Sequence, residues 1–313
     1  MANVIDKNRR FYEKHVAPMI RDRFSAYESR IAVGLVGEGS DCFGYDDEIS
    51  RDHDFGTGVC LWLTDEDMSL FGDELSKAYD DLVDSEQRSF LTKRLRERRG
   101  VMTIHDFYSD ILGIDCDTSN CRITDADWAD LDHSCLKTAT NGEIFRDDLG
   151  AFTAFRNALL EYYPDRVWRN RIAEQLHKYS SSFQTNYARC MARGDVVSAT
   201  VCKAKGIESA MELFFLLKRK YPPYYKWTYR ALCELDEEGE FAAKIKELGE
   251  ESIRLETWNG TKYLPNRQNY KDMNVALSEE IASEVEQTLL EMGLIKKVGR
   301  YLEIHVDEIL QEK

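Results

Sequence analysis

The sequence has few of the features that mark several large classes of protein. It contains no run of about 18 apolar residues, so no membrane-spanning helix is expected, and residues 1–7 contain no apolar signal core. Proline is scarce, with 5 residues in 313, and 43% of the residues are hydrophobic. This composition is typical of a globular chain and excludes a disordered or collagen-like one. The length predicts two domains.

Positive charge is also in deficit. Lys and Arg total 42 against 57 Asp and Glu, which gives a formal net charge of −15. An acidic surface repels phosphate backbones, so broad coating of nucleic acid is not expected, although a local basic groove stays open. The eight cysteines are scattered through the chain. We interpret them as reduced thiols of a cytoplasmic protein.

Strand signals are concentrated in the first 150 residues and are nearly absent from there to about residue 255. A charged amphipathic helix is expected over residues 3–29, and short apolar runs predict strands at 31–36, 59–63 and 101–104. The dipeptide Asn141-Gly142 predicts a hairpin turn between residues 135–137 and 144–146. Together these elements predict a small mixed sheet with helices.

Helical patterns dominate from residue 151 onwards, so we expect an α+β protein with domains at 1–150 and 151–313, the second an α-helical bundle. Near the C-terminus, a predicted helix at 278–292 is followed by a glycine-containing segment at 293–304. We interpret this segment as a two-stranded cap on the bundle. A winged-helix element is the alternative, but the many acids of residues 278–313 favour the cap.

The sharpest motif is Gly37-Glu38-Gly39-Ser40, followed after eleven residues by Asp52-His53-Asp54. It is not a dinucleotide fingerprint, because Cys42 stands where the third glycine belongs. It is not a phosphate-binding P-loop either, because Ser40 replaces the required lysine. The glycines allow backbone N–H groups and the Ser40 hydroxyl to approach phosphate oxygens.

Asp52 and Asp54 are two residues apart, so in a strand their carboxylates project from the same face. Carboxylate oxygens are hard ligands that suit magnesium, and magnesium bridges the oxygens of a nucleoside triphosphate. His53 faces the opposite side, where we interpret it as a structural, hydrogen-bonded residue.

A Gly-Ser turn followed about a dozen residues later by Asp-x-Asp resembles the nucleotidyltransferase superfamily of the DNA polymerase β type. Residues 37–55 resemble one bacterial branch in particular, a domain family of unknown function that is described only as nucleotidyltransferase-like. Residues 193–195 (Arg-Gly-Asp) and 221–227 (Tyr-Pro-Pro-Tyr-Tyr-Lys-Trp) resemble the helical half of that branch. The resemblance covers roughly residues 30–230.

The resemblance implies a set of site residues. Asp52 and Asp54 would hold a two-ion magnesium site, while Gly39 and Ser40 would anchor the triphosphate. Lys226 would contact the triphosphate while an aromatic neighbour, Tyr224, stacks on the base. From the residues alone, a surface corner between two helices explains Lys226 equally well.

The sequence departs from the superfamily at the third carboxylate. Met102 stands near the position where related members carry Glu, and Asp106 takes that role only if the register shifts. Asp106 is therefore the third catalytic candidate beside Asp52 and Asp54. The departure also favours an alternative function, a non-catalytic protein that binds nucleotides and regulates a partner.

The expected function is a metal-dependent nucleotidyltransferase that moves a nucleoside monophosphate from a triphosphate to an acceptor and releases pyrophosphate. The acceptor that we expect first is a small hydroxylated molecule, by analogy of fold alone. A protein or a tRNA is the alternative acceptor. A nucleic-acid-binding module that uses the C-terminal element is a third, weaker alternative.

Overall fold

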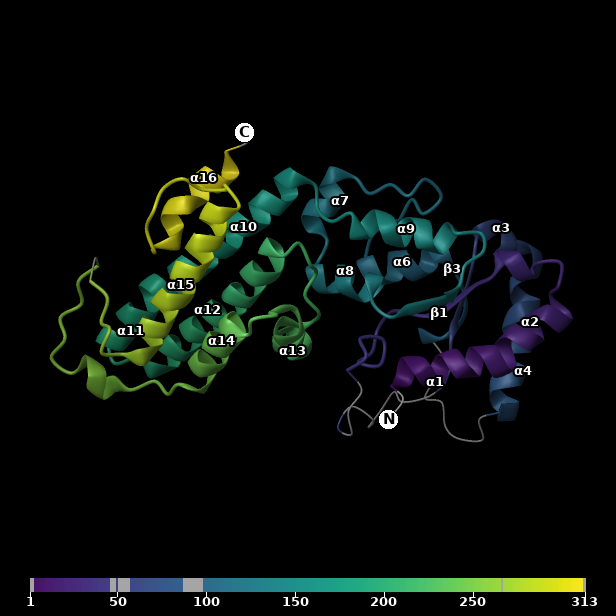
Figure 1. Ribbon diagram of the computed structural model, residues 1–313, viewed down its shortest axis with the longest axis horizontal. Coiled ribbons are helices and arrows are strands. Elements are labelled where there is room, and N and C mark those ends of the chain that lie inside the picture. The colour runs from purple at the N-terminus through teal and green to yellow at the C-terminus, as the bar shows by residue number, and fades with distance from the viewer. Residues whose placement is uncertain (1–2, 46–48, 50–56, 87–97, 266, 312–313) are drawn as a thin grey trace. The chain divides into compact units, whose positions relative to one another are not determined.

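The chain divides into two compact units, Met1–Tyr162 and Tyr163–Lys313 (Figure 1). The structure, a computed structural model, describes residues 3–45, 49, 57–86, 98–265 and 267–311. Four strands form one mixed sheet in the first unit, and helices form most of the rest, which confirms the predicted α+β class. The unit boundary falls after helix α9 (Ala151–Leu160), so this helix belongs to the unit that holds the sheet.

The sheet has the strand order β3-β2-β1-β4. Strand β1 runs antiparallel to both β2 and β4, whereas β3 runs parallel to β2. The apolar runs at 31–36, 59–63 and 101–104 therefore predicted three strands correctly, each to within two residues at either end. The strands are β1 (Ala32–Leu35), β2 (Cys60–Leu63), β3 (Gly100–Thr103) and β4 (Glu143–Arg146).

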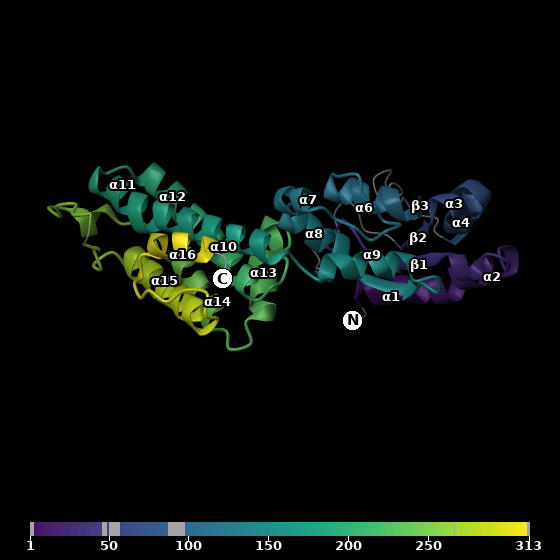
Figure 2. The same ribbon diagram turned by 90° about the horizontal axis from the view of Figure 1, so that it is seen from above.

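Helices cover both faces of the sheet, which explains why β1 and β2 are apolar throughout (Figure 2). Val33 and Leu61 belong to a core cluster with side chains of the N-terminal helices and of α4. On the other face, the Trp62 ring stacks on Phe152 of α9 at 3.8 Å and meets Phe107 of α6 edge-on. The helices of this unit are α1 (Val4–Phe11), η1 (Tyr12–Val16), α2 (Ala17–Arg23), η2 (Glu28–Arg30), α3 (Asp65–Asp67), η4 (Met68–Gly72), α4 (Asp73–Glu86), α6 (Ile104–Leu112), α7 (Asp125–Asp130), α8 (His133–Thr140) and α9.

The predicted hairpin at Asn141-Gly142 is wrong on its first side, because residues 135–137 lie in helix α8 and only residues 143–146 form a strand. The dipeptide makes a tertiary contact and does not form a hairpin turn. Gly142 has φ +62°, and a Cβ there would lie 2.9 Å from the carbonyl carbon of Leu35. Only glycine lets the chain pass this close to the end of β1.

The second unit is a helical bundle built around α12, the longest helix. Helix α10 runs directly into a π-helical segment, η5, and then into α11, and both α10 and η5 pack against α12. None of the described helices is long and apolar enough to cross a membrane. The elements are α10 (Asp165–Tyr179), η5 (Ser180–Tyr187), α11 (Ala188–Ala192), α12 (Val196–Leu217), α13 (Tyr225–Leu235), α14 (Glu240–Glu250), η6 (Leu255–Trp258), α15 (Met273–Glu291), η7 (Leu302–His305) and α16 (Val306–Leu310).

The predicted two-stranded cap is wrong, because residues 294–304 contain no strand and lead into η7 and α16. Buried side-chain hydrogen bonds hold this segment in place of a strand ladder. The Gln184 amide donates to the Arg300 carbonyl at 2.7 Å, and its oxygen accepts from the Leu302 N–H at 3.0 Å. The side chain of Gln184, a π-helical residue, thus fixes the backbone of this segment. The glycines of the segment had suggested a hairpin there.

Two helical glycines of the second unit provide a matched test of its packing. A Cβ on Gly206 of α12 would lie 2.7 Å from the Cβ of buried Phe183, whereas a Cβ on Gly249 of α14 meets nothing within 4 Å. We expect Gly206→Ala to destabilise the protein by about 1–3 kcal/mol through overpacking. Gly249→Ala is expected to stabilise it by up to about 1 kcal/mol, through helix propensity.

Thermal unfolding of the two variants measures the difference, since each kcal/mol shifts the midpoint by roughly 2–4 °C for a unit of this size. Equal shifts in the two variants would contradict the close contact between α12 and η5.

Candidate functional site

The glycine turn that follows β1, residues 37–45, is the predicted phosphate-binding element. Gly37 and Gly39 have φ values of +118° and +114°, which only glycine adopts readily. A side chain at Gly39 would also collide with the carboxylate of Asp41. Gly39 and Ser40 are half-buried. The glycines are therefore required by the backbone of this turn, as the sequence predicts.

Asn141, which lies just before β4, fixes the first residue of the turn. Its side-chain oxygen accepts from the Gly37 N–H at 2.9 Å, and its amide nitrogen donates to the Gly37 carbonyl at 2.7 Å. Asn141 is itself 5% exposed, and its own carbonyl accepts from Arg156 of α9 at 2.8 Å. Because the site is buried, both Gly37 groups depend on this one amide.

The turn presents a run of backbone donors. Its internal hydrogen bonds use the N–H groups of residues 42–45, which donate to Gly39, Ser40 and Asp41. No described residue accepts a hydrogen bond from the N–H groups of residues 38–41. Successive N–H groups in a turn with positive φ values form a concave anion-binding geometry.

Arg99 anchors the turn to the start of β3. Its guanidinium donates to the Asp41 carboxylate at 2.9 Å and to the Cys42 sulfur at 3.3 Å, with all three residues buried. Burial raises the pKa of the Cys42 thiol well above its ordinary value, so the thiol is neutral and the ion pair is Arg99 with Asp41. The neighbouring Arg98 pairs with Glu38 at 2.8 Å.

The sheet topology gathers these parts at one edge. Strand β2 is antiparallel to β1, and Gly34 pairs with Cys60, so β2 begins where β1 ends. Strand β3 is parallel to β2, and Gly100 pairs with Cys60, so β3 begins at the same edge. The start of β4 joins them, because Leu35 pairs with Glu143.

The two aspartates that carry the metal prediction, Asp52 and Asp54, lie outside the described residues, as does His53. Among the residues that the structure describes, no group of three or more His, Cys, Asp or Glu side chains could hold a metal ion. The described chain resumes at Thr57, three residues before β2.

The structure does not bring Asp106 to the glycine turn. Thr103, the last residue of β3, pairs with Leu63 at the end of β2, which is the opposite end of the sheet. Asp106 follows in the first turn of α6, where its N–H donates to the Thr103 cap and its side chain is 63% exposed. Met102 lies within β3, opposite Trp62.

Lys226 and Tyr224 lie in the second unit, where Tyr224 precedes the first residue of α13. The Lys226 ammonium lies 5.7 Å from the Tyr224 ring and 5.3 Å from the Trp227 ring. The Trp227 indole N–H donates to the Tyr224 hydroxyl at 2.9 Å. The two predicted residues thus share one cluster, with Trp227 between them.

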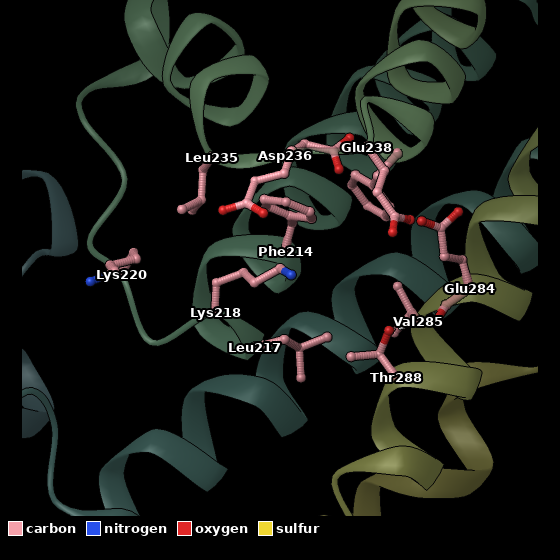
Figure 3. Close-up of a pocket in the computed structure, with 12 residues that line it drawn as sticks. Phe214, Leu217, Lys218, Lys220, Leu235, Asp236, Glu238, Glu284, Val285 and Thr288 are labelled. Carbon is pink, nitrogen blue, oxygen red and sulfur yellow. Dashed lines mark hydrogen bonds between the residues drawn. The ribbon is translucent and has the colours of Figure 1, made fainter.

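A pocket of about 500 Å³ lies in the second unit and contains none of the predicted site residues (Figure 3). Phe214 and Phe241 stack at 4.9 Å in its lining. Lys218 extends beneath Phe214, while Asp236 and Glu238 approach from the other side. Charges of both signs thus share the lining, and they favour no single class of ligand.

Sequence reasoning missed the residues that shape the turn, namely Asn141, Arg156 and Arg99. Each contacts residues 37–42 or their anchors across a long sequence separation, so spacing carries no signal for it. The one visible signal was the Asn141-Gly142 dipeptide, which local turn preference interprets as a hairpin.

Part of the chain matches the model of a protein family. The family model of a domain of unknown function, DUF4037, matches residues 128–228, about a third of the 313-residue chain. The matched span runs from α7 in the first unit to the first residues of α13 in the second, and it excludes the glycine turn. No curated protein and no solved structure matches the chain.

Removing the Asn141 amide tests its part in the turn. We expect Asn141→Ala to destabilise the protein by about 2–4 kcal/mol, because it leaves a buried N–H and a buried carbonyl of Gly37 without partners. Thermal unfolding measures the loss. The matched control is Asn120→Ala, whose side chain is exposed and bonds only to Asp117, and it should change stability by less than about 0.5 kcal/mol.

His105 provides a pH-dependent test of the start of α6. Hydrogen bonds to Asp115 and Asp106 raise the pKa of His105 above its usual value. The protonated ring is therefore favoured in the folded state, and its stabilising contribution is present at low pH and lost as pH rises through the raised pKa.

An NMR titration of the ring should show this raised pKa, and Asp115→Asn should lower it towards the usual value. Asp110→Asn on the same helix is the control. An unchanged titration in Asp115→Asn would contradict the contact.

Proposed function

We propose that the protein is a metal-dependent nucleotidyltransferase that moves a nucleoside monophosphate from a triphosphate to a hydroxyl-bearing acceptor and releases pyrophosphate. The observation that supports this proposal is the glycine turn at the end of β1, whose N–H groups at residues 38–41 donate to no described residue. The donor set suits phosphate oxygens, because backbone N–H groups bind them without a charged side chain.

In this proposal the turn binds the phosphates through Gly39 and Ser40, with the Ser40 hydroxyl as a further donor. The Arg99–Asp41 pair and the Asn141 amide keep the turn in its binding conformation before the nucleotide arrives. A preformed donor set reduces the reorganisation that accompanies transfer of the phosphoryl group.

The metal ligands in the proposal are Asp52 and Asp54, which precede β2 in the chain. A pair of carboxylates is the kind of ligand that Mg²⁺ takes alongside substrate phosphates. Bound magnesium would neutralise charge on the triphosphate and on the leaving pyrophosphate. A small hydroxylated molecule is the acceptor class that we propose.

A non-catalytic nucleotide-binding regulator is the second candidate, and the position of Asp106 favours it. With Asp106 at the end of the sheet opposite the turn and Met102 in β3, neither supplies a third carboxylate beside the turn. A protein that keeps the phosphate turn and lacks the third acid would bind nucleotide without transferring it.

Thermal unfolding with each nucleoside triphosphate and Mg²⁺ tests the nucleotide site. A ligand at 100 times its dissociation constant adds about 2.7 kcal/mol of stability, which raises the midpoint by several degrees. We expect this rise in the wild type, and we expect Asp52→Asn/Asp54→Asn and Gly39→Ala to lack it. Asp106→Asn is the matched control, because its carboxylate lies at the opposite end of the sheet and the rise should persist.

Pyrophosphate release in the presence of hydroxylated acceptors then separates the two candidates. Release that is lost in Asp52→Asn/Asp54→Asn supports the transferase, whereas a nucleotide-dependent rise without release supports the regulator. The absence of any rise in the wild type would overturn both.

A further inference from the structure

The segment from the end of α12 to the second turn of α13 is positively charged, whereas the protein as a whole is acidic. Residues 218–230 read Lys-Arg-Lys-Tyr-Pro-Pro-Tyr-Tyr-Lys-Trp-Thr-Tyr-Arg, with five cations, five aromatic residues and no acid. In a chain with 57 acids among 313 residues, a stretch of 13 would contain about two. This concentration of positive charge is therefore a local property of one corner of the second unit.

The aromatic and cationic side chains of this corner form one surface, which we call the α13 surface: Tyr224, Tyr225, Lys226, Trp227 and Arg230. The Trp227 ring has Lys226 at 5.3 Å and Arg230 at 5.6 Å. Tyr225 is 85% exposed and meets the Tyr224 ring at 6.4 Å. Lys226 forms no ion pair with any described residue. The surface thus presents the open ring of Tyr225 and, on Lys226, a cation that has no ion-pair partner among the described residues.

Buried contacts hold the backbone beneath the α13 surface. Tyr221 is 5% exposed and packs edge-on against Tyr163, and the Thr228 hydroxyl donates to the Pro223 carbonyl at 3.0 Å. Arg219 has φ +50°, an uncommon conformation for a residue with a side chain, and its guanidinium lies 3.8 Å from the Trp168 ring. The surface is therefore presented by a fixed corner.

We infer that the α13 surface binds single-stranded nucleic acid, with the Tyr225 ring stacking on a base and Lys226 and Arg230 contacting phosphates. Proteins that bind single strands combine these two elements, a cationic track for the backbone and aromatic rings for the bases. The inference rests on the second unit alone and stands whether or not the first unit transfers a nucleotide.

The arrangement favours a single strand over other anionic partners. A duplex keeps its base faces stacked inside, so an exposed tyrosine has nothing to stack on. A free nucleoside triphosphate offers one base and one compact triphosphate chain, whereas the cations of this segment extend from the end of α12 into the second turn of α13.

Acids border the α13 surface and limit where a phosphate backbone can lie. Arg219 lies 3.6 Å from Asp165, and Arg230 lies 3.5 Å from Glu234. Asp236 and Glu238 line the pocket of Figure 3 opposite Lys218. A phosphate backbone is therefore expected to cross the first turns of α13 and to avoid the pocket.

Fluorescence anisotropy of a labelled 12-residue oligoadenylate RNA, titrated with the full chain at several salt concentrations, tests the inference. We expect Tyr225→Ala to weaken binding about 5- to 160-fold, which corresponds to the 1–3 kcal/mol typical of one stacked base, and Tyr225→Phe to bind as the wild type does. Lys226→Ala/Arg230→Ala should reduce the slope of log affinity against log salt by about 1.4, or about 0.7 for each phosphate contact.

The matched controls are Tyr270→Ala and Lys297→Ala, exposed residues of the same unit away from the α13 surface, and neither should change affinity. Asp52→Asn/Asp54→Asn should also bind RNA normally, so failure of the proposed nucleotide site is distinguishable from failure of this inference.

Three results would overturn the inference. They are no binding at low salt, equal affinity for the duplex of the same sequence, or displacement of the RNA by ATP at concentrations similar to the RNA's own. The last result would assign the surface to a free nucleotide. The DNA strand of the same sequence reports whether the 2′-hydroxyl contributes: equal affinity supports recognition by stacking and phosphate alone, as inferred here.

Discussion

The candidate site depends on one buried amide, that of Asn141. Its two hydrogen bonds to Gly37 tie the turn after β1 to the junction of α8 and β4, more than a hundred residues along the chain. Gly142 permits this approach because any side chain there would collide with Leu35. Arg156 then holds the Asn141 carbonyl from α9. The conformation of the glycine turn is thus set by the packing of the whole first unit.

Charge is used differently in the two units. At the edge of the sheet, Arg98 and Arg99 are paired with Glu38 and Asp41, so the arginines shape the turn, and our proposal assigns phosphate binding to its backbone N–H groups. On the α13 surface the cations lie beside aromatic rings, and Lys226 has no acidic partner among the described residues. The first arrangement fits a compact phosphate group held by a rigid turn, and the second fits an extended anion.

The choice between a transferase and a regulator depends on the direction of β3. Because β3 runs parallel to β2, its first residue lies at the edge of the glycine turn, and the residues after it lead away from that edge. Asp106, in the first turn of α6, is therefore distant from the turn by topology, whatever its local register. Any third carboxylate near the turn would come from the beginning of β3 or from another element.

The sequence by itself determined the α+β class, three of the four strands and the need for glycine at positions 37 and 39, because each depends on local hydrophobic patterning or backbone conformation. It also determined the basic and aromatic composition of residues 218–230. It predicted wrongly at Asn141-Gly142 and at residues 294–304, where local turn signals were overridden by contacts with Gly37 and Gln184. Only the tertiary structure decided which residues surround the glycine turn, and it showed that Asp106 is not among them. Strand direction and long-range hydrogen bonds decide both points, and neither can be inferred from residue spacing.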